Sequence, residues 1–104
     1  MDCKKKENFV LGAEGSGVIE DVAEGLDQNL KGRKVAFISD GWSQYVIKDQ
    51  DDLLFLDNSV DLKIAADAIV NPVTALSLRR MVYDLKANCV LIDSANTSLG
   101  RMLI

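Results

Sequence analysis

The sequence contains no histidine, and this single absence removes several kinds of active site. Ser-His-Asp and Cys-His nucleophile systems use imidazole as the general base, so neither can be built from this chain. Histidine is also the commonest protein ligand of metal ions, and the two cysteines, Cys3 and Cys89, form no C-x-x-C pair. We therefore expect neither histidine-based catalysis nor a metal centre.

Cysteines, long apolar runs and excess positive charge are also scarce. Two cysteines are too few for a disulfide framework, so we expect the cytoplasm or another reducing intracellular compartment, with Cys89 as a buried thiol. No apolar run approaches the ~20 residues that cross a bilayer, so we expect no membrane span. The formal net charge of −4 argues against nucleic acid as a partner, because phosphate backbones attract basic surfaces.

What remains is the composition of a globular protein. Hydrophobic residues make up 48% of the 104 residues and charged residues 27%, which is more apolar than disordered chains are. We divide the sequence into three parts: residues 1–11 as a flexible N-terminal segment, residues 12–57 as a β domain, and residues 58–104 as helices followed by one last strand and turn.

The β part reads as a succession of short strands. Residues 12–17 are rich in glycine, but Val18–Val22 then alternates as a strand does, whereas a phosphate loop would open a helix. We therefore interpret residues 12–17 as a strand entry where backbones pack closely. Further strands are predicted at Lys34–Ile38, at Trp42–Lys48 after an Asp40-Gly41 turn, and at Leu53–Leu56. This succession indicates an antiparallel sheet or part of a barrel.

Helical periodicity begins near Asn58. Ser59 can cap a first helix with Asp61 in its first turn, and the single proline, Pro72, marks the start of a second. The second helix carries an apolar stripe that should face a core, formed by Leu78, Met81, Val82 and Leu85. Arg79 and Arg80 lie off this stripe, as solvated side chains or as contacts to a phosphate or a partner. Asn88 is placed to end the helix in a left-handed conformation.

The last stretch predicts a strand, a tight turn and a helix. Val90–Ile92 is apolar and β-branched, as in a strand that is buried on both faces. Small residues and Gly100 follow, and the apolar residues after them begin a helix. Strand, small-residue turn and helix form the opening half of a dinucleotide-binding unit, in which the helix N-terminus offers N–H groups to a pyrophosphate.

Five segments, taken in order, resemble signature motifs of the medium-chain dehydrogenase/reductase superfamily, in its zinc-free, quinone-oxidoreductase-like branch. They are Gly12–Val18 (G-x-E-G-x-G-V), Gly32–Ala36 (G-D-R-V), Gly41–Val46 (G-x-Y-A-E-Y-V), Val70–Ala75 (V-N-P-x-T-A) and Ser94–Met102 (A-A-x-S-x-L-G-x-M). The resemblance implies a mixed α/β fold: antiparallel strands of a partial chaperonin-10-like barrel, two helices, and the first strand-turn-helix of a Rossmann fold.

The resemblance also implies a cofactor, NADPH or NADH, and the reduction of quinones, enones or 2-enoyl thioesters by hydride transfer. Carried over residue by residue, Asn71 and Thr74 would lie by the nicotinamide. Ser94, Ala95, Asn96, Thr97, Ser98, Leu99 and Gly100 would approach the pyrophosphate, with Thr97 at the position of the middle glycine of the nucleotide fingerprint.

The sequence leaves two functions open. The residues belong to a reductase, of which this short chain alone would be inactive, or they form a non-catalytic remnant that docks onto a larger or self-associated assembly. Either way, we expect Met102, Leu103 and Ile104 to contact another chain or a second copy, or Val90–Ile92 to pair with a strand from one, because a lone strand leaves its edges open.

Overall fold

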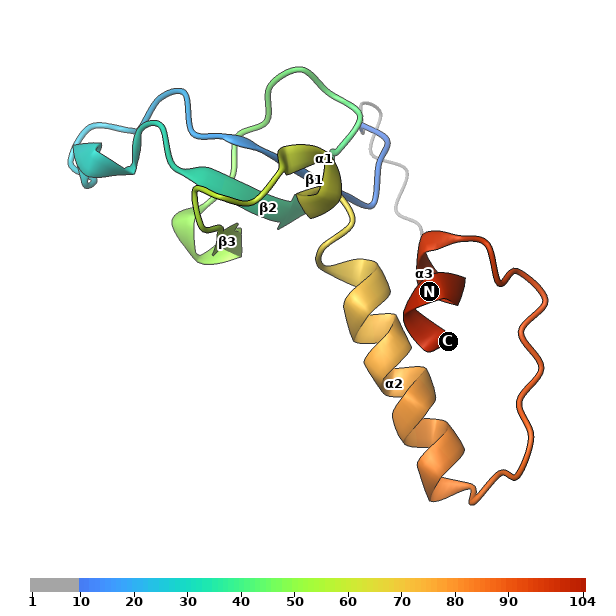
Figure 1. The fold of residues 1–104 in the computed structure, drawn as a ribbon. Coiled ribbons are helices and arrows are strands. Elements are labelled where there is room, and N and C mark those ends of the chain that lie inside the picture. Colours follow the sequence, from blue (N-terminus) through green and yellow to red (C-terminus); the bar gives the residue numbers. More distant parts are fainter. Residues whose placement is uncertain (1–9) are drawn as a thin grey trace.

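In a computed structural model that describes residues 10–104, a three-stranded antiparallel sheet is followed by a short helix that lies against it and by a long helix that extends away from it (Figure 1). The strands lie in the order β1-β2-β3. The elements are β1 (Glu14–Val18), β2 (Lys34–Ile38), β3 (Leu53–Phe55), the 3₁₀ turns η1 (Gln28–Leu30) and η2 (Gln50–Asp52), α1 (Leu62–Ala65), α2 (Val70–Asp84) and α3 (Ser98–Leu103). The mixed α/β class is confirmed. The expected flexible segment 1–11 lies largely outside the described residues.

Strand β1 is the glycine-rich segment itself. Gly15 stands opposite Phe37 of β2, and a Cβ on Gly15 would lie 2.9 Å from the Phe37 ring. Close packing is therefore confirmed at Gly12 and Gly15 but not at Gly17, where a Cβ would meet nothing within 4 Å. The strand ends at Val18 and does not occupy Val18–Val22. Phe37 and its neighbours Val35 and Ala36 are buried and form the centre of the sheet.

The predicted hairpin between β2 and residues 42–48 is wrong. The chain does turn after β2, where Ser39 and Asp40 have φ values of 68° and 61°. After the turn, however, the Trp42 N–H donates to the Leu11 carbonyl over 2.8 Å, and residues 43–48 form no strand. The physical reason is that β1 and β3 already occupy both edges of β2, so a returning strand has no ladder to join.

The helix boundaries also differ from the predicted ones. Asp61, not Ser59, caps α1, because the Ser59 hydroxyl donates to the Asp57 carboxylate instead. Helix α2 ends at Asp84 with Leu85 as its C-cap, and the left-handed residue that follows is Lys86, with φ 50°, and not Asn88. The Lys86 N–H donates to the Tyr83 carbonyl and the next N–H donates to the Val82 carbonyl, which together form a Schellman motif.

The predicted strand at residues 90–92 is absent. Val90 is 52% exposed, Leu91 is 93% exposed, and the thiol of Cys89, expected to be buried, is exposed as well. A parallel strand is stable only between hydrogen-bonded neighbours, and the described residues place no strand beside this segment. The turn and helix predicted to follow it do form, as Asp93–Thr97 and α3.

The described chain is open. Its radius of gyration is 17.0 Å, whereas a compact domain of this length has about 13 Å. Of α2, only Ala75 is buried, so the stripe predicted to face a core is wrong for its exposed members, Leu78, Met81 and Leu85. Helix α2, at 15 residues the longest of the described part, falls short of a bilayer crossing.

Candidate functional site

The turn before α3 is closed by the side chain of Thr97. Its hydroxyl donates a hydrogen bond to the Ser94 carbonyl over 2.8 Å and accepts one from the Gly100 N–H over 3.1 Å. The Thr97 N–H donates to the same carbonyl of Ser94 over 3.1 Å. Thr97 is thus the N-cap of α3. The nucleotide fingerprint has glycine at this position, and here the threonine hydroxyl caps the helix instead.

Gly100 lies in the first turn of α3 and packs against the backbone of that turn. A Cβ on Gly100 would overlap the Ser94 carbonyl and would lie 2.8 Å from the Ala95 Cα. Gly100 is buried, whereas Ser94, Ala95, Asn96, Thr97 and Ser98 are exposed and Leu99 is half-buried. The absence of a side chain at Gly100 therefore allows helix and turn to approach closely.

These residues fit an anionic group in their chemistry. The first N–H groups of a helix have no intrahelical acceptor, and Thr97 satisfies only that of Gly100. Among the residues described, the N–H groups of Ser98 and Leu99 remain free to face a ligand, beside small and exposed side chains. No strand precedes this turn in the described residues.

Asn71 and Thr74 lie near the start of α2 and are half-buried. The Thr74 hydroxyl donates to the Val70 carbonyl over 2.7 Å, one turn earlier. The Asn71 amide donates to the carboxylate of Asp67, which lies between α1 and α2. Both side chains are therefore held by local hydrogen bonds, and each keeps an oxygen that can accept a further one.

A cavity of about 440 Å³ lies between α1 and α3. It is lined by Lys63, Ile64, Asp67, Ser98, Arg101 and Met102. Of the predicted site residues, Ser98 lines this cavity, whereas Asn71 and Thr74 do not. Asn71 is connected to it through its hydrogen bond to Asp67. Its two cationic side chains outnumber its one carboxylate, so the local charge favours an anion. In Figure 1, α3 lies beside the N-terminal half of α2, which it contacts.

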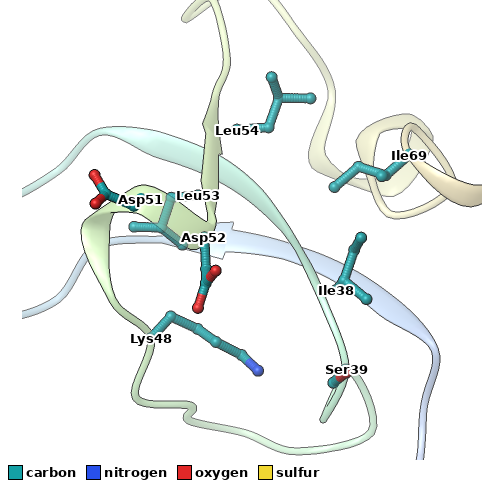
Figure 2. Close-up of a pocket in the computed structure, with 8 residues that line it drawn as sticks. All are labelled: Ile38, Ser39, Lys48, Asp51, Asp52, Leu53, Leu54 and Ile69. Atoms are coloured by element: carbon teal, nitrogen blue, oxygen red, sulfur yellow. The ribbon is translucent and has the colours of Figure 1, made fainter.

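A second cavity, of about 590 Å³, lies between the sheet and the start of α2 (Figure 2). Its wall combines apolar and charged side chains: Ile38, Ser39, Lys48, Asp51, Asp52, Leu53, Leu54 and Ile69. The Lys48 ammonium pairs with the Asp40 carboxylate over 2.7 Å. No sequence pattern indicated this cavity, because segments far apart in the chain form it.

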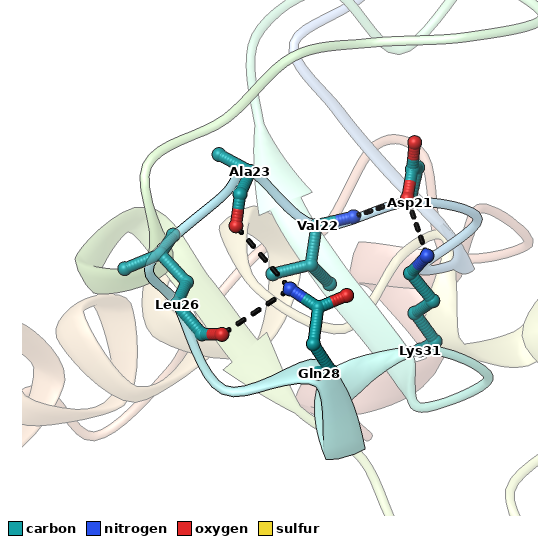
Figure 3. A network of polar contacts seen from close by, with 6 residues as sticks. All are labelled: Asp21, Val22, Ala23, Leu26, Gln28 and Lys31. Carbon is teal, nitrogen blue, oxygen red and sulfur yellow. Dashed lines mark hydrogen bonds and ion pairs between the residues drawn. The ribbon is translucent and has the colours of Figure 1, made fainter.

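The loop between β1 and β2 carries a polar network that stabilises its own fold (Figure 3). Asp21 pairs with Lys31 over 2.6 Å and accepts the Val22 N–H over 2.9 Å. The hydrogen bond from Lys31 is the main reason that the pKa of Asp21 lies below its ordinary value. Gln28 donates to the carbonyls of Ala23 and Leu26. This network contains no residue of the predicted site.

Sequence reasoning missed Glu14. Its carboxylate accepts hydrogen bonds from the backbone N–H groups of Ile69 and Val70, at the start of the helix that carries Asn71 and Thr74. The available signal was an acidic residue among the glycines of β1, where a side chain has room to reach across the sheet face.

Comparison with known proteins gives one informative likeness. Over 64 residues, the chain is 36% identical to the mitochondrial enoyl-[acyl-carrier-protein] reductase of Caenorhabditis elegans. The match covers 61% of this chain and 18% of that protein, so the chain spans less than a fifth of the length of its relative. No family model matches the sequence, and no solved structure matches it. The likeness supports the medium-chain dehydrogenase/reductase superfamily.

Proposed function

We propose that this chain is part of an NADPH-dependent reductase that reduces 2-enoyl thioesters. The observation that carries the proposal is the 36% identity to an enoyl-[acyl-carrier-protein] reductase, together with the Thr97-capped turn packed on Gly100. Quinones and enones, which the motif resemblance also allowed, have no counterpart in the name of this relative. An enoyl thioester is therefore the substrate class that we prefer, within the zinc-free branch.

The residues take roles that follow from their chemistry. When bound, the nicotinamide cofactor supplies the hydride, and the protein supplies binding and orientation. Ser94–Gly100 would hold the diphosphate through free N–H groups and small side chains. Lys63 and Arg101, on the neighbouring cavity wall, would offset its charge. Asn71 and Thr74 would orient the nicotinamide end. Because hydride transfer needs the rest of the protein, we expect no turnover by these 104 residues alone.

Cofactor binding tests this proposal directly. The purified chain is titrated with NADPH, and the fluorescence of the cofactor is followed. We expect saturable binding, which Gly100→Val should weaken by about tenfold or more, because a misplaced binding turn forfeits its hydrogen bonds. Gly17→Val is the matched control, since a Cβ at Gly17 meets nothing within 4 Å. No fluorescence change at millimolar NADPH would contradict the proposal and favour the non-catalytic alternative.

We also propose that another chain or a second copy covers the C-terminal segment. Leu91 is 93% exposed and Ile104 is 87% exposed, which is costly for apolar side chains in water. Sedimentation velocity tests this idea: Leu91→Asp combined with Ile104→Asp should lower the sedimentation coefficient of an assembled species. Ile47→Asp, at a fully exposed position in the β part, is the control. A wild-type chain that sediments as a monomer at all concentrations, alone and with cell extract, would contradict this proposal.

A further inference from the structure

Three side chains of the sheet hold the backbone of residues 58–70, and we call them the sheet latch: Glu14, Ser16 and Lys34. The Ser16 hydroxyl donates a hydrogen bond to the Leu62 carbonyl over 2.6 Å. The Lys34 ammonium donates to the carbonyls of Asn58 and Val60, each over 2.7 Å. The sequence separations of 24 to 56 residues make these the long-range polar contacts between the sheet and the helical part.

The latch residues share one face of the sheet. Glu14 and Ser16 are alternate residues of β1, and Lys34 stands directly opposite Val18, the next residue of that alternation. The buried side chains on this side are small: Ala36, opposite Ser16, is 0% exposed, and Ala65 of α1 is 1% exposed. Little apolar surface is therefore buried here, so the position of the helical part depends on the latch.

Within the latch, Glu14 acts on the start of α2. Its Oε2 accepts hydrogen bonds from the Ile69 N–H over 3.0 Å and from the Val70 N–H over 2.9 Å. Ile69 is the N-cap of α2 and has no polar side chain with which to cap it. The first N–H groups of a helix lack intrahelical acceptors, and a carboxylate there also opposes the positive end of the helix dipole. Glu14 thus caps a helix that begins 56 residues later.

We infer that Glu14 is a positioning residue, which fixes the start of α2 against β1 and thereby sets where Asn71 and Thr74 stand. Both residues follow within four positions of Val70, and a helix transmits the placement of its first turn to the next. The capping of α2 by Glu14 does not depend on the proposed function. The effect on cofactor binding rests on the proposed function.

Hydrogen exchange of individual amides, measured by NMR on the whole chain, tests the contact. Glu14→Ala should speed exchange of the Ile69 and Val70 amides by about tenfold, because a charge-assisted hydrogen bond is lost. Glu14→Gln keeps an acceptor oxygen without the charge, so it should fall between wild type and Glu14→Ala. The Phe37 amide, within β2, reports that the sheet remains intact.

Glu20→Ala is the matched control, because Glu20 is exposed and lies just beyond β1. It should leave the exchange of Ile69 and Val70 unchanged. If Glu14→Ala leaves their exchange at the wild-type rate, the capping contact is refuted. If Glu14→Ala does not fold, Glu14→Gln decides: exchange at the wild-type rate refutes the contact, and exchange faster by about threefold supports it.

The cofactor readout separates this inference from the proposed function. If the wild-type chain binds NADPH, Glu14→Ala should raise the Kd and Glu14→Gln should restore part of the affinity, whereas Glu20→Ala should not change it. Faster exchange with an unchanged Kd would overturn positioning and leave only a structural cap. If the wild-type chain binds no NADPH, the proposed function fails, while the exchange result still decides the capping contact.

Discussion

The ring of Phe37 lies against the Cα of Gly15, in space that a methyl group on Gly15 would need. A Cβ at this position would be 2.9 Å from one ring carbon and 3.1 Å from another. The two residues stand directly opposite in the β1–β2 ladder, so neither backbone can retreat without breaking the pairing. The absence of a side chain at Gly15 therefore lets this small sheet bury the ring of Phe37.

This contact predicts that alanine substitutions at Gly15 and Gly17 of β1 will change the free energy of unfolding by different amounts. Gly15→Ala should lower the free energy of unfolding by about 1–3 kcal/mol, as overpacking of a filled site does. Gly17→Ala, where a Cβ meets nothing within 4 Å, should change it by less than about 0.5 kcal/mol. Urea denaturation followed by circular dichroism measures both values. Equal values for the two variants would contradict the packing that we describe.

The hydroxyl of Thr97 caps α3, and we predict that its removal destabilises this helix. Thr97→Ala should cost about 1 kcal/mol of helix stability, since the Gly100 N–H loses its acceptor. Thr97→Ser keeps the hydroxyl and should cost much less. Exchange of the Gly100 amide is the measurement, because it reports the capping bond itself. Faster exchange in Thr97→Ser than in Thr97→Ala would show that the methyl group, not the hydroxyl, holds the turn.

Local signals in the sequence identified those elements that depend on local interactions. Lys34–Ile38 is a strand with the predicted bounds, and β3 differs from the prediction by one residue. The turn before α3 also formed where small residues and Gly100 indicated it. The start of α3 was foreseeable, because a helix start depends on neighbouring residues. The role of these residues as a site stays a prediction.

The wrong predictions concern interactions with distant parts of the chain. Residues 42–48 have the composition of a strand, but β1 and β3 leave them no free edge of β2. Residues 90–92 suit a buried strand, and the described chain provides no neighbour for it. The role of Glu14 depends on a contact 55 residues away, which periodicity cannot reveal. Pairing partners and long-range caps are properties of the fold, not of a sequence window.

The end of α2 predicts a stabilising substitution. Lys86 has φ 50°, a left-handed conformation that is strained for a side chain with a Cβ and favourable for glycine. Lys86→Gly should raise the free energy of unfolding by about 0.5–1 kcal/mol, because it removes the strain of this C′ position. Asn88→Gly, at the position that the sequence suggested, should not stabilise the protein. Stabilisation by Asn88→Gly but not by Lys86→Gly would place the helix end where the sequence indicated it.

The Asp57 turn predicts a dependence on acid pH with a defined sign. The hydroxyl and then the N–H of Ser59 donate to this carboxylate, over 2.6 and 2.8 Å, and they hold the pKa of Asp57 below its ordinary value. A carboxyl whose pKa is lower in the folded state contributes stability above its unfolded pKa, and this contribution is lost as the pH falls through the folded pKa. Stability should therefore decline on the acid side, and Ser59→Ala should reduce that slope.

An NMR titration of the carboxyl carbons measures the effect one residue at a time. Ser59→Ala should raise the pKa of Asp57 toward its ordinary value and leave that of Asp21 unchanged. Lys31→Ala should raise the pKa of Asp21 and leave that of Asp57 unchanged, because Lys31 is the main cause of the lowered pKa of Asp21. Ser43→Ala is the control, since the Ser43 hydroxyl donates to a backbone carbonyl and not to a carboxylate. An unchanged pKa of Asp57 in Ser59→Ala would refute the hydrogen bond as its cause.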